Sequence, residues 1–203
     1  MPVTTDSLTD FLLHKGVLTT LDFPGASDTL ATGINDSGTV VGYWDLVDSN
    51  GNLLISHGYT WSNGTFTQLD FPGAGDTYIF GVNNRGDIVG EWDTGVASTT
   101  GHGFVLSKGQ FISFDVPFAG ATITQANDIN AKGSIVGEWL DASGGIHGFL
   151  VEGAKFTSID YPGAAITSVW GINSAGQIVG NHFDTVNSTS RGYIAQPGKK
   201  GKP

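Results

Sequence analysis

The strongest constraint on the fold of this chain is a fourfold internal repeat. Residues 21–45 read LDFPGASDTLATGINDSGTVVGYWD, and residues 69–93 read LDFPGAGDTYIFGVNNRGDIVGEWD. Two further copies begin at Phe114 and Ile159, so the copies follow one another every 45 to 48 residues. The matched columns are Asp22, Asp70, Asp115 and Asp160; Asn35, Asn83, Asn130 and Asn173; and Gly42, Gly90, Gly137 and Gly180. A period of this length is typical of solenoids and propellers.

Each copy has the pattern of a four-stranded β-sheet. Short runs of alternating, β-branched or aromatic residues are separated by Gly, Asn, Asp and Ser, and no useful helical periodicity is present. In the first copy the expected strands are LATGIN, TVVGYWD, HGYTW and TFTQLDFP. A proline ends each fourth strand, since proline cannot donate a hydrogen bond to the ladder. The sequence therefore predicts an all-β fold of four-stranded antiparallel sheets.

Four strands in about 45 residues predict the blades of a four-bladed β-propeller. We expect a single domain over 11–195, with repeats at about 24–71, 72–116, 117–161, and 162–195 plus 11–23. Residues 1–10 and 196–203 are expected to be flexible ends.

The ends of the chain predict how the ring closes. The chain begins with a copy of strands three and four and stops after a copy of strand three at Arg191 to Ala195. The N-terminal strand, Val17 to Phe23, is therefore expected to complete the last blade, which leaves Phe11 to Leu13 surplus, paired at an edge or displaced. The alternatives are an open β-solenoid and half of a larger ring completed by a partner chain.

A further motif connects the repeats to a known family. It reads His57-Gly58-Tyr59, His102-Gly103-Phe104 and His147-Gly148-Phe149, and it is altered to Arg191-Gly192-Tyr193 in the last copy. Together with the D-F-P-G-A and I-N-x-x-G-x-I-V-G columns, it resembles the bacterial extracellular repeats named for a His-Ala-Phe motif (HAF repeats). The resemblance spans residues 11–195 and departs at Arg191 and at Phe118, where two residues are inserted. It implies a secreted or surface-associated protein and no catalytic set.

Composition excludes several classes of function. The net charge is -10, with 9 Lys and Arg in 203 residues, so the chain lacks the basic surface that binds nucleic acid. No run of about 18 apolar residues is present, which predicts no membrane span. Cysteine is absent, which excludes disulfides and thiolate metal sites. No cofactor is expected to be required.

Two repeated polar columns have simple structural interpretations. Asn35 and its equivalents precede a turn that ends in glycine, where asparagine bonds to its own backbone. The His57 column supplies one histidine per repeat, and such histidines cannot converge on a metal unless they face the axis. We therefore interpret them as structural hydrogen-bonding residues.

The ends of the second strands form the candidate site, at the channel mouth of the predicted propeller. Loops from all blades meet there, and the predicted ligand-binding residues are Tyr43, Trp44, Glu91, Trp92, Glu138, Trp139, Asn181 and His182. Aromatic and carboxylate groups together suit a glycan or polyol, although packing between blades is the simpler interpretation of the tryptophans. The candidate metal ligands are Asp45, Asp93, Asp141 and Asp184. Carboxylates suit Ca²⁺, while a solvated acidic rim is the alternative.

Three functions remain open. The first is a non-enzymatic module that binds a small molecule or carbohydrate, or a cation, outside the cell or at its surface. The second is a hydrolase or lyase that uses Glu91, Glu138 or His182 as acid–base groups. The third is a structural scaffold or a segment that forms homo-oligomers.

Overall fold

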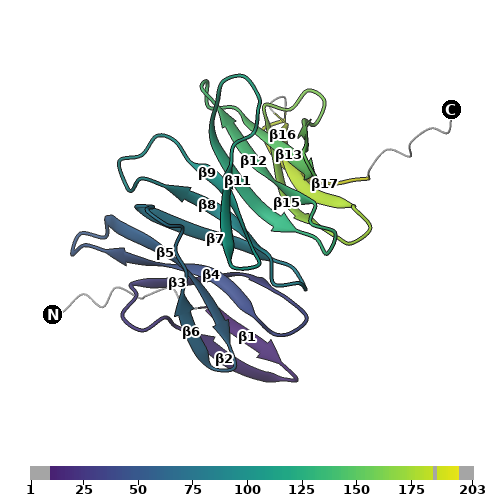
Figure 1. Ribbon diagram of the computed structural model, residues 1–203. Coiled ribbons are helices and arrows are strands. Elements are labelled where there is room, and N and C mark those ends of the chain that lie inside the picture. Colours follow the sequence, from purple (N-terminus) through teal and green to yellow (C-terminus); the bar gives the residue numbers. More distant parts are fainter. Residues whose placement is uncertain (1–9, 185–186, 197–203) are drawn as a thin grey trace.

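The protein is an array of β-sheets, described here from a computed structural model (Figure 1). The structure describes residues 10–184 and 187–196, and all regular structure among them is β-strand, which confirms the all-β prediction. The expected flexible ends fall largely on residues 1–9 and 197–203, which lie outside the described residues. The strands are β1 (Asp10–His14), β2 (Val17–Leu21), β3 (Asp28–Ile34), β4 (Val40–Val47), β5 (Leu53–Ser62), β6 (Thr65–Gln68), β7 (Asp76–Val82), β8 (Ile88–Asp93), β9 (His102–Ser107), β10 (Gln110–Phe114), β11 (Ala121–Ile129), β12 (Ile135–Asp141), β13 (Ile146–Glu152), β14 (Lys155–Ile159), β15 (Ile166–Ile172), β16 (Ile178–Asp184) and β17 (Thr189–Ala195).

The strands pair in the order of the repeat. The first three repeats form the antiparallel meanders β3–β6, β7–β10 and β11–β14, and the fourth repeat forms β15–β17. A single parallel pair, Ile146 with Ile166, joins the third and fourth of these meanders. Figure 1 shows the meanders following one another, with β1 and β2 at one end and β17 at the other. We number the four repeats by these strands.

Each first strand carries a β-bulge that explains the glycine column in the second strand. In the third repeat the register shifts between Ala126 and Asp128, opposite Gly137. The bulge brings the carbonyl oxygen of Gln125 so close to Gly137 that a Cβ atom there would overlap it. The same overlap exists at the equivalent glycines of the other repeats, which are Gly42, Gly90 and Gly180. Glycine is needed here for space, because the bulge pushes backbone into the neighbouring strand.

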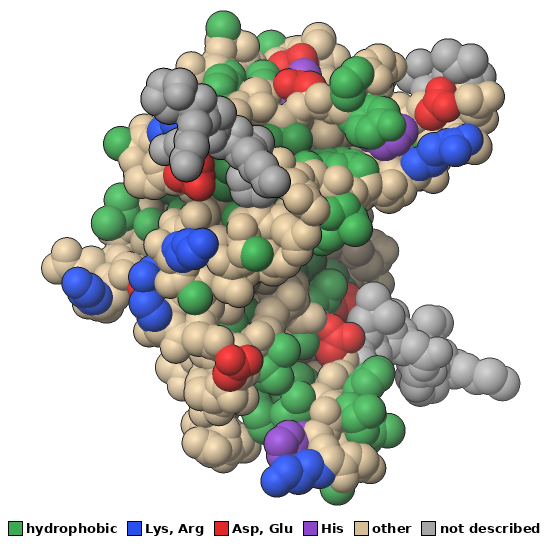
Figure 2. Space-filling view, turned by 90° about the vertical axis from the view of Figure 1, so that its right-hand side faces the viewer, with side chains coloured by type: hydrophobic (Ala, Val, Ile, Leu, Met, Phe, Trp, Pro, Cys, Tyr) green, Lys and Arg blue, Asp and Glu red, His purple; other side chains and the backbone are tan. Residues whose placement is uncertain are grey.

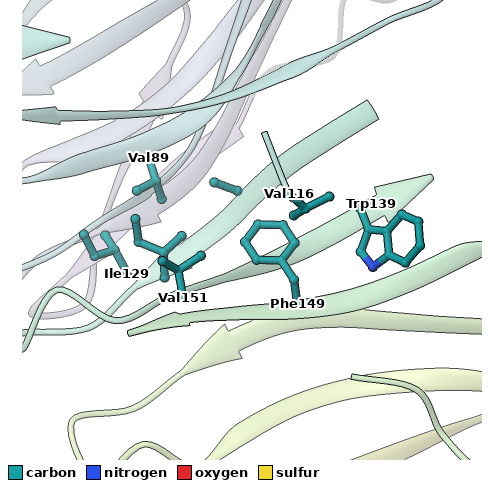
Figure 3. Close-up of a cluster of buried hydrophobic side chains, with 8 residues drawn as sticks. Val89, Val116, Ile129, Trp139, Phe149 and Val151 are labelled. Atoms are coloured by element: carbon teal, nitrogen blue, oxygen red, sulfur yellow. The ribbon is translucent and has the colours of Figure 1, made fainter. Parts of the chain in front are cut away.

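The hydrophobic core lies between consecutive sheets. Val89 of the second repeat is in one cluster with Ile129, Phe149 and Val151 of the third, and Figure 3 shows it on a strand above the strands that carry those side chains. Equivalent clusters join the first repeat to the second and the third to the fourth. Each sheet is therefore stabilised by its neighbour, as expected in a repeat array.

Closure of a ring by the N-terminal strand is not a feature of this structure. The strand β2 pairs with β1 in a separate two-stranded sheet, and β17 pairs with β16 alone among the described strands. The reason is local. His14 pairs with Val17 across Lys15 and Gly16, whose φ angles of 49° and 81° are those of a tight type I′ hairpin turn. Pairing over such a short loop costs less chain entropy than closing a ring.

Candidate functional site

The tryptophans of the predicted mouth belong to a ring stack that recurs in each of the first three repeats. In the second repeat Trp92 stacks on Phe71 at 4.5 Å between centroids and on His102 at 4.7 Å. In the first repeat Trp44 packs in the same way against Phe23 and His57. These contacts use the ring faces for packing within the protein.

The third repeat rebuilds the stack from a different residue. At the position of Phe23 and Phe71 the third repeat has Val116. Phe118, from the two-residue insertion, packs on Trp139 instead, with 5.2 Å between the ring centroids. Trp139 also stacks on His147, with 4.2 Å between the ring centroids. The departure from the repeat pattern at Phe118 therefore preserves the packing.

The histidines of the stacks bond to the repeated aspartate that follows the fourth strand of the same sheet. The Nδ1 atoms of His57, His102 and His147 lie 3.0, 2.9 and 2.6 Å from carboxylate oxygens of Asp70, Asp115 and Asp160. Each pair ties a third strand to the end of the fourth, so the histidines hydrogen-bond within a repeat. Burial alone would lower the pKa of His147, but its bonds to Asp160 and Asp141 outweigh burial and raise that pKa.

The two predicted catalytic glutamates lie between sheets. The carboxylate of Glu91 lies beside Gly101, which pairs with Ile123 of the third repeat, so this glutamate lies where the second and third repeats meet. Burial, with a smaller contribution from Asp93, raises the pKa of Glu91 to about 8. Glu138 is buried in the next interface, where Oε1 has no hydrogen-bond partner, and burial raises its pKa despite bonds from Ser168 and the Val169 N–H. Each glutamate is thus in a separate interface.

Tyr43 and Asn181 occupy the same column of the second strand as the glutamates. Tyr43 packs edge-on against Tyr78 of the second repeat, with 5.2 Å between centroids. Asn181 accepts a hydrogen bond from the Trp170 indole at 2.5 Å and donates to Ser190 at 3.1 Å. The column therefore packs between sheets in the first three repeats and lies on the last sheet in the fourth.

The predicted metal ligands each stabilise a local turn or strand contact. Asp45 accepts from the Ser56 hydroxyl at 2.6 Å, and Asp93 accepts from the Gly95 N–H at 2.6 Å. Asp141 accepts from Ser143, Gly145 and His147, and bonds led by that of Ser143 hold its pKa well below the usual range. Asp184 accepts from Asn187 at 2.6 Å. Among the described residues no group of three or more His, Cys, Asp or Glu is placed to hold a metal ion. Figure 2 likewise shows acidic side chains in separate spots on the face that it draws.

We expect calcium to have little effect on stability, because these carboxylates already bond within their own turns or to the neighbouring strand. Neither EDTA nor excess CaCl₂ should change the melting temperature, which differential scanning calorimetry measures. A melting temperature that rises with calcium concentration would contradict this expectation, since a ligand that binds the folded state stabilises it.

The fourth repeat replaces the packed stack with a polar cavity. Tyr161, His182 and Arg191 stand where the second repeat has Phe71, Trp92 and His102. Tyr161 stacks on His182 at 3.6 Å between centroids, and a cavity of about 330 Å³ opens beside them, also lined by Asp184 and by residues 162–164. His182 is buried, and its Nδ1 atom has no hydrogen-bond partner among the described residues. We call this cavity the fourth-repeat pocket.

Sequence reasoning identified part of this pocket and missed another repeated contact. Arg191 was recognised as a departure from its column, and His182 and Asp184 were predicted site residues. Tyr161 was not predicted, although its hydroxyl is a departure from the phenylalanine of the first two repeats. The missed contact is a buried threonine hydroxyl that accepts the backbone N–H after the repeated aspartate. It is found at Thr29, Thr77, Thr124 and Thr167. The signal was present as a column of four threonines.

The fold and the pocket define a repeat protein of consecutive antiparallel sheets with one diverged copy. No model of a known protein family matches the chain, and a search of curated proteins finds no match. None of the described residues forms a helix long and apolar enough to cross a membrane.

Proposed function

We propose that the chain is a non-enzymatic binding module of a secreted or surface protein, and that it binds an acidic saccharide in the fourth-repeat pocket. The observation that carries the proposal is the divergence of one stack out of four. Three repeats fill this place with tryptophan and histidine rings, whereas the fourth opens a polar cavity of about 330 Å³. Repeat scaffolds acquire function by changing such positions while the frame is kept.

The chemistry of the pocket favours a sugar that carries a carboxylate. Tyr161 is 42% exposed, and aromatic rings with an exposed face offer a platform for the apolar face of a sugar. Arg191 is exposed beside it, and a guanidinium binds a carboxylate through two parallel hydrogen bonds. Asp184 and His182 add polar groups that can bond to hydroxyls. The cavity is at the small end of the range for ligand sites, which suits one or two sugar rings.

Catalysis has less support. The two glutamates with raised pKa values lie in different sheet interfaces, and neither lines the fourth-repeat pocket. Among the described residues His182 has no partner at Nδ1 that would orient it as a general base. Within the part of the chain that the structure describes, the pocket therefore holds neither of the two predicted catalytic glutamates, and its histidine has no partner at Nδ1 that would orient it beside Asp184.

We expect Arg191→Ala to weaken the binding of uronate disaccharides by about tenfold or more, because a charge-assisted hydrogen bond is lost. Isothermal titration calorimetry with galacturonate, glucuronate and mannuronate disaccharides measures the affinity. The methyl esters of the same sugars should bind to the wild type as weakly as the acids bind to the variant. Arg85→Ala is the matched control, since Arg85 pairs with Asp87 at 2.7 Å, outside the pocket. Equal affinity for acid and ester, or full affinity in Arg191→Ala, would contradict the proposal.

A further inference from the structure

The last sheet exposes a side chain that every other repeat buries. Val41, Val89 and Val136 occupy one column of the second strand, and each is fully buried against the following sheet. Val179 occupies the same column in the fourth repeat and is 46% exposed. The face of β15–β17 therefore presents the residue that elsewhere makes the contact, or joint, between consecutive sheets, but no sheet among the described residues lies opposite it.

The first sheet exposes part of the surface that would receive such a contact. Val41 is in one cluster with Val82 and Ile88 of the following repeat. The equivalents of these receiving residues in the first repeat are Ile34 and Val40. Ile34 is 54% exposed, whereas Val82 is 8% exposed. Val40 is buried, and a cavity of about 190 Å³ beside it is lined by Ile34 and by Phe11 and Leu12 of β1.

A series of asparagine side-chain hydrogen bonds that links consecutive sheets also ends at the last sheet. The Nδ2 atoms of Asn35, Asn83 and Asn130 donate to the carbonyl oxygens of the next repeat's asparagine, at 3.2, 3.1 and 3.1 Å. Asn83 also donates to Asp87 within its own turn, so its amide makes two bonds. Asn173 makes the equivalent bond in its own turn, to Gln177 at 2.8 Å, and its second N–H has no acceptor among the described residues.

The repeated glycine of the third strand also shows that the contacts to a following sheet stop at the fourth repeat. Cβ atoms added at Gly58, Gly103 and Gly148 would meet side chains of the next repeat's first strand, such as Val169 opposite Gly148. At Gly192 the nearest atom is the Gly180 carbonyl oxygen at 3.8 Å, in its own sheet. Space that three repeats fill with the next sheet is thus open on the fourth.

We propose that a second copy of this chain fills the open space over the last sheet. The β15–β17 face of one copy would pack on the β3–β4 face of the next. The contacts would repeat the three joints inside the chain: Val179 would pack on Ile34 and Val40, and Asn173 would donate to the carbonyl of Asn35. The two faces are different surfaces, so the association is head to tail and gives a closed ring or an open array.

The joint also completes the last sheet. In the first three joints the third strand lies on the next repeat's first strand, and on β3 that place is held by β1. The incoming β17 would replace β1, whose Phe11 and Leu13 are largely exposed. The strand β2 would then pair with β17 as a fourth strand of the β15–β17 sheet. That pairing brings Asp22 to Arg191, as Asp70 meets His57 inside the chain. Both residues are exposed, and their charges are opposite.

This inference does not rest on the proposed saccharide site, although Arg191 has a role in both proposals. The tests therefore change Val179 and Ile34, which do not line the fourth-repeat pocket. Failure of one proposal leaves the other standing.

The first test is association in solution. Sedimentation velocity on the wild type should show the mass rising with concentration, and Val179→Asp should raise the dissociation constant by about tenfold or more, because a charge would be buried without a partner. The fold should persist, since Val179 is already half exposed, and near-ultraviolet circular dichroism checks this. Ile112→Asp, at a position 56% exposed on β10, is the control that should associate like the wild type. A wild type that stays monomeric at every concentration, or a Val179→Asp variant that associates equally well, overturns the proposal.

The second test uses the absence of cysteine in the chain. Under mild oxidation the double variant Ile34→Cys with Val179→Cys should form disulfide-linked dimers and larger species on a non-reducing gel. The double variant Val96→Cys with Ile112→Cys, at two exposed positions off these faces, should stay monomeric. A monomer with an internal disulfide in the first variant would show that the chain closes on itself as a four-bladed ring. Either that result or free thiols in both variants overturns the proposal.

Discussion

Gly137→Ala is expected to lower the free energy of unfolding by about 3 kcal/mol or more, because there is no space for a methyl group. The added Cβ would overlap the Gln125 carbonyl oxygen and would lie 2.9 Å from Cε1 of Phe149, which is fully buried. Neither neighbour can move freely, since Gln125 belongs to the bulged strand and Phe149 to the core cluster. Urea unfolding followed by tryptophan fluorescence measures the loss.

Gly192→Ala is the matched control, because Gly192 is also a strand glycine with no strained φ angle. Its added Cβ would have its nearest neighbour at 3.8 Å, so a change within about 0.5 kcal/mol is expected. Both substitutions remove similar backbone freedom from the unfolded chain, and the difference between them isolates the steric cost in the folded state. Similar losses for the two variants would contradict this account of the glycine column.

The strands and turns could be predicted from the sequence because they depend on local chemistry. The Oδ1 atom of Asn35 accepts the N–H groups of Ser37 and Thr39 at 3.2 and 3.0 Å, which confirms the predicted turn. The Nδ2 atom of the same residue bonds to the next sheet at Asn83. That second bond depends on how the sheets are rotated against one another, which alternation and turn signals do not report.

The candidate site was harder to predict for the same reason. Alternation correctly separates Trp44 from Val41 and Tyr43, but it does not say what lies opposite each face. The structure puts a stack of rings against Trp44 and the next sheet against Tyr43. Glu91 holds the position of Tyr43 in the second repeat, so Glu91 also faces the next sheet. Residues that look like the rim of a mouth in one strand are interface residues once the neighbouring sheet is in place.

Glu91→Gln is expected to stabilise the protein at pH 7 by up to about 3 kcal/mol, because it removes a carboxyl group that is costly to ionise in the folded state. Burial, followed by Asp93, raises the pKa of Glu91 from 4.5 to about 8. Above pH 4.5 the unfolded chain loses this proton, while the folded chain keeps it up to about pH 8. Over that interval the unfolded state binds fewer protons than the folded state, so the wild type loses stability as the pH rises.

Urea unfolding of wild type and Glu91→Gln at half-unit steps from pH 4.5 to pH 8.5 measures this difference. Subtracting the two curves cancels the titration of histidines and aspartates that both proteins share. The gap should widen with pH up to about 8 and then stay constant. Glu152→Gln, at an exposed position at the end of β13, should show no such widening. A gap that is constant from pH 4.5 upward would mean that Glu91 ionises normally in the folded protein, and therefore that water reaches the interface between the second and third sheets.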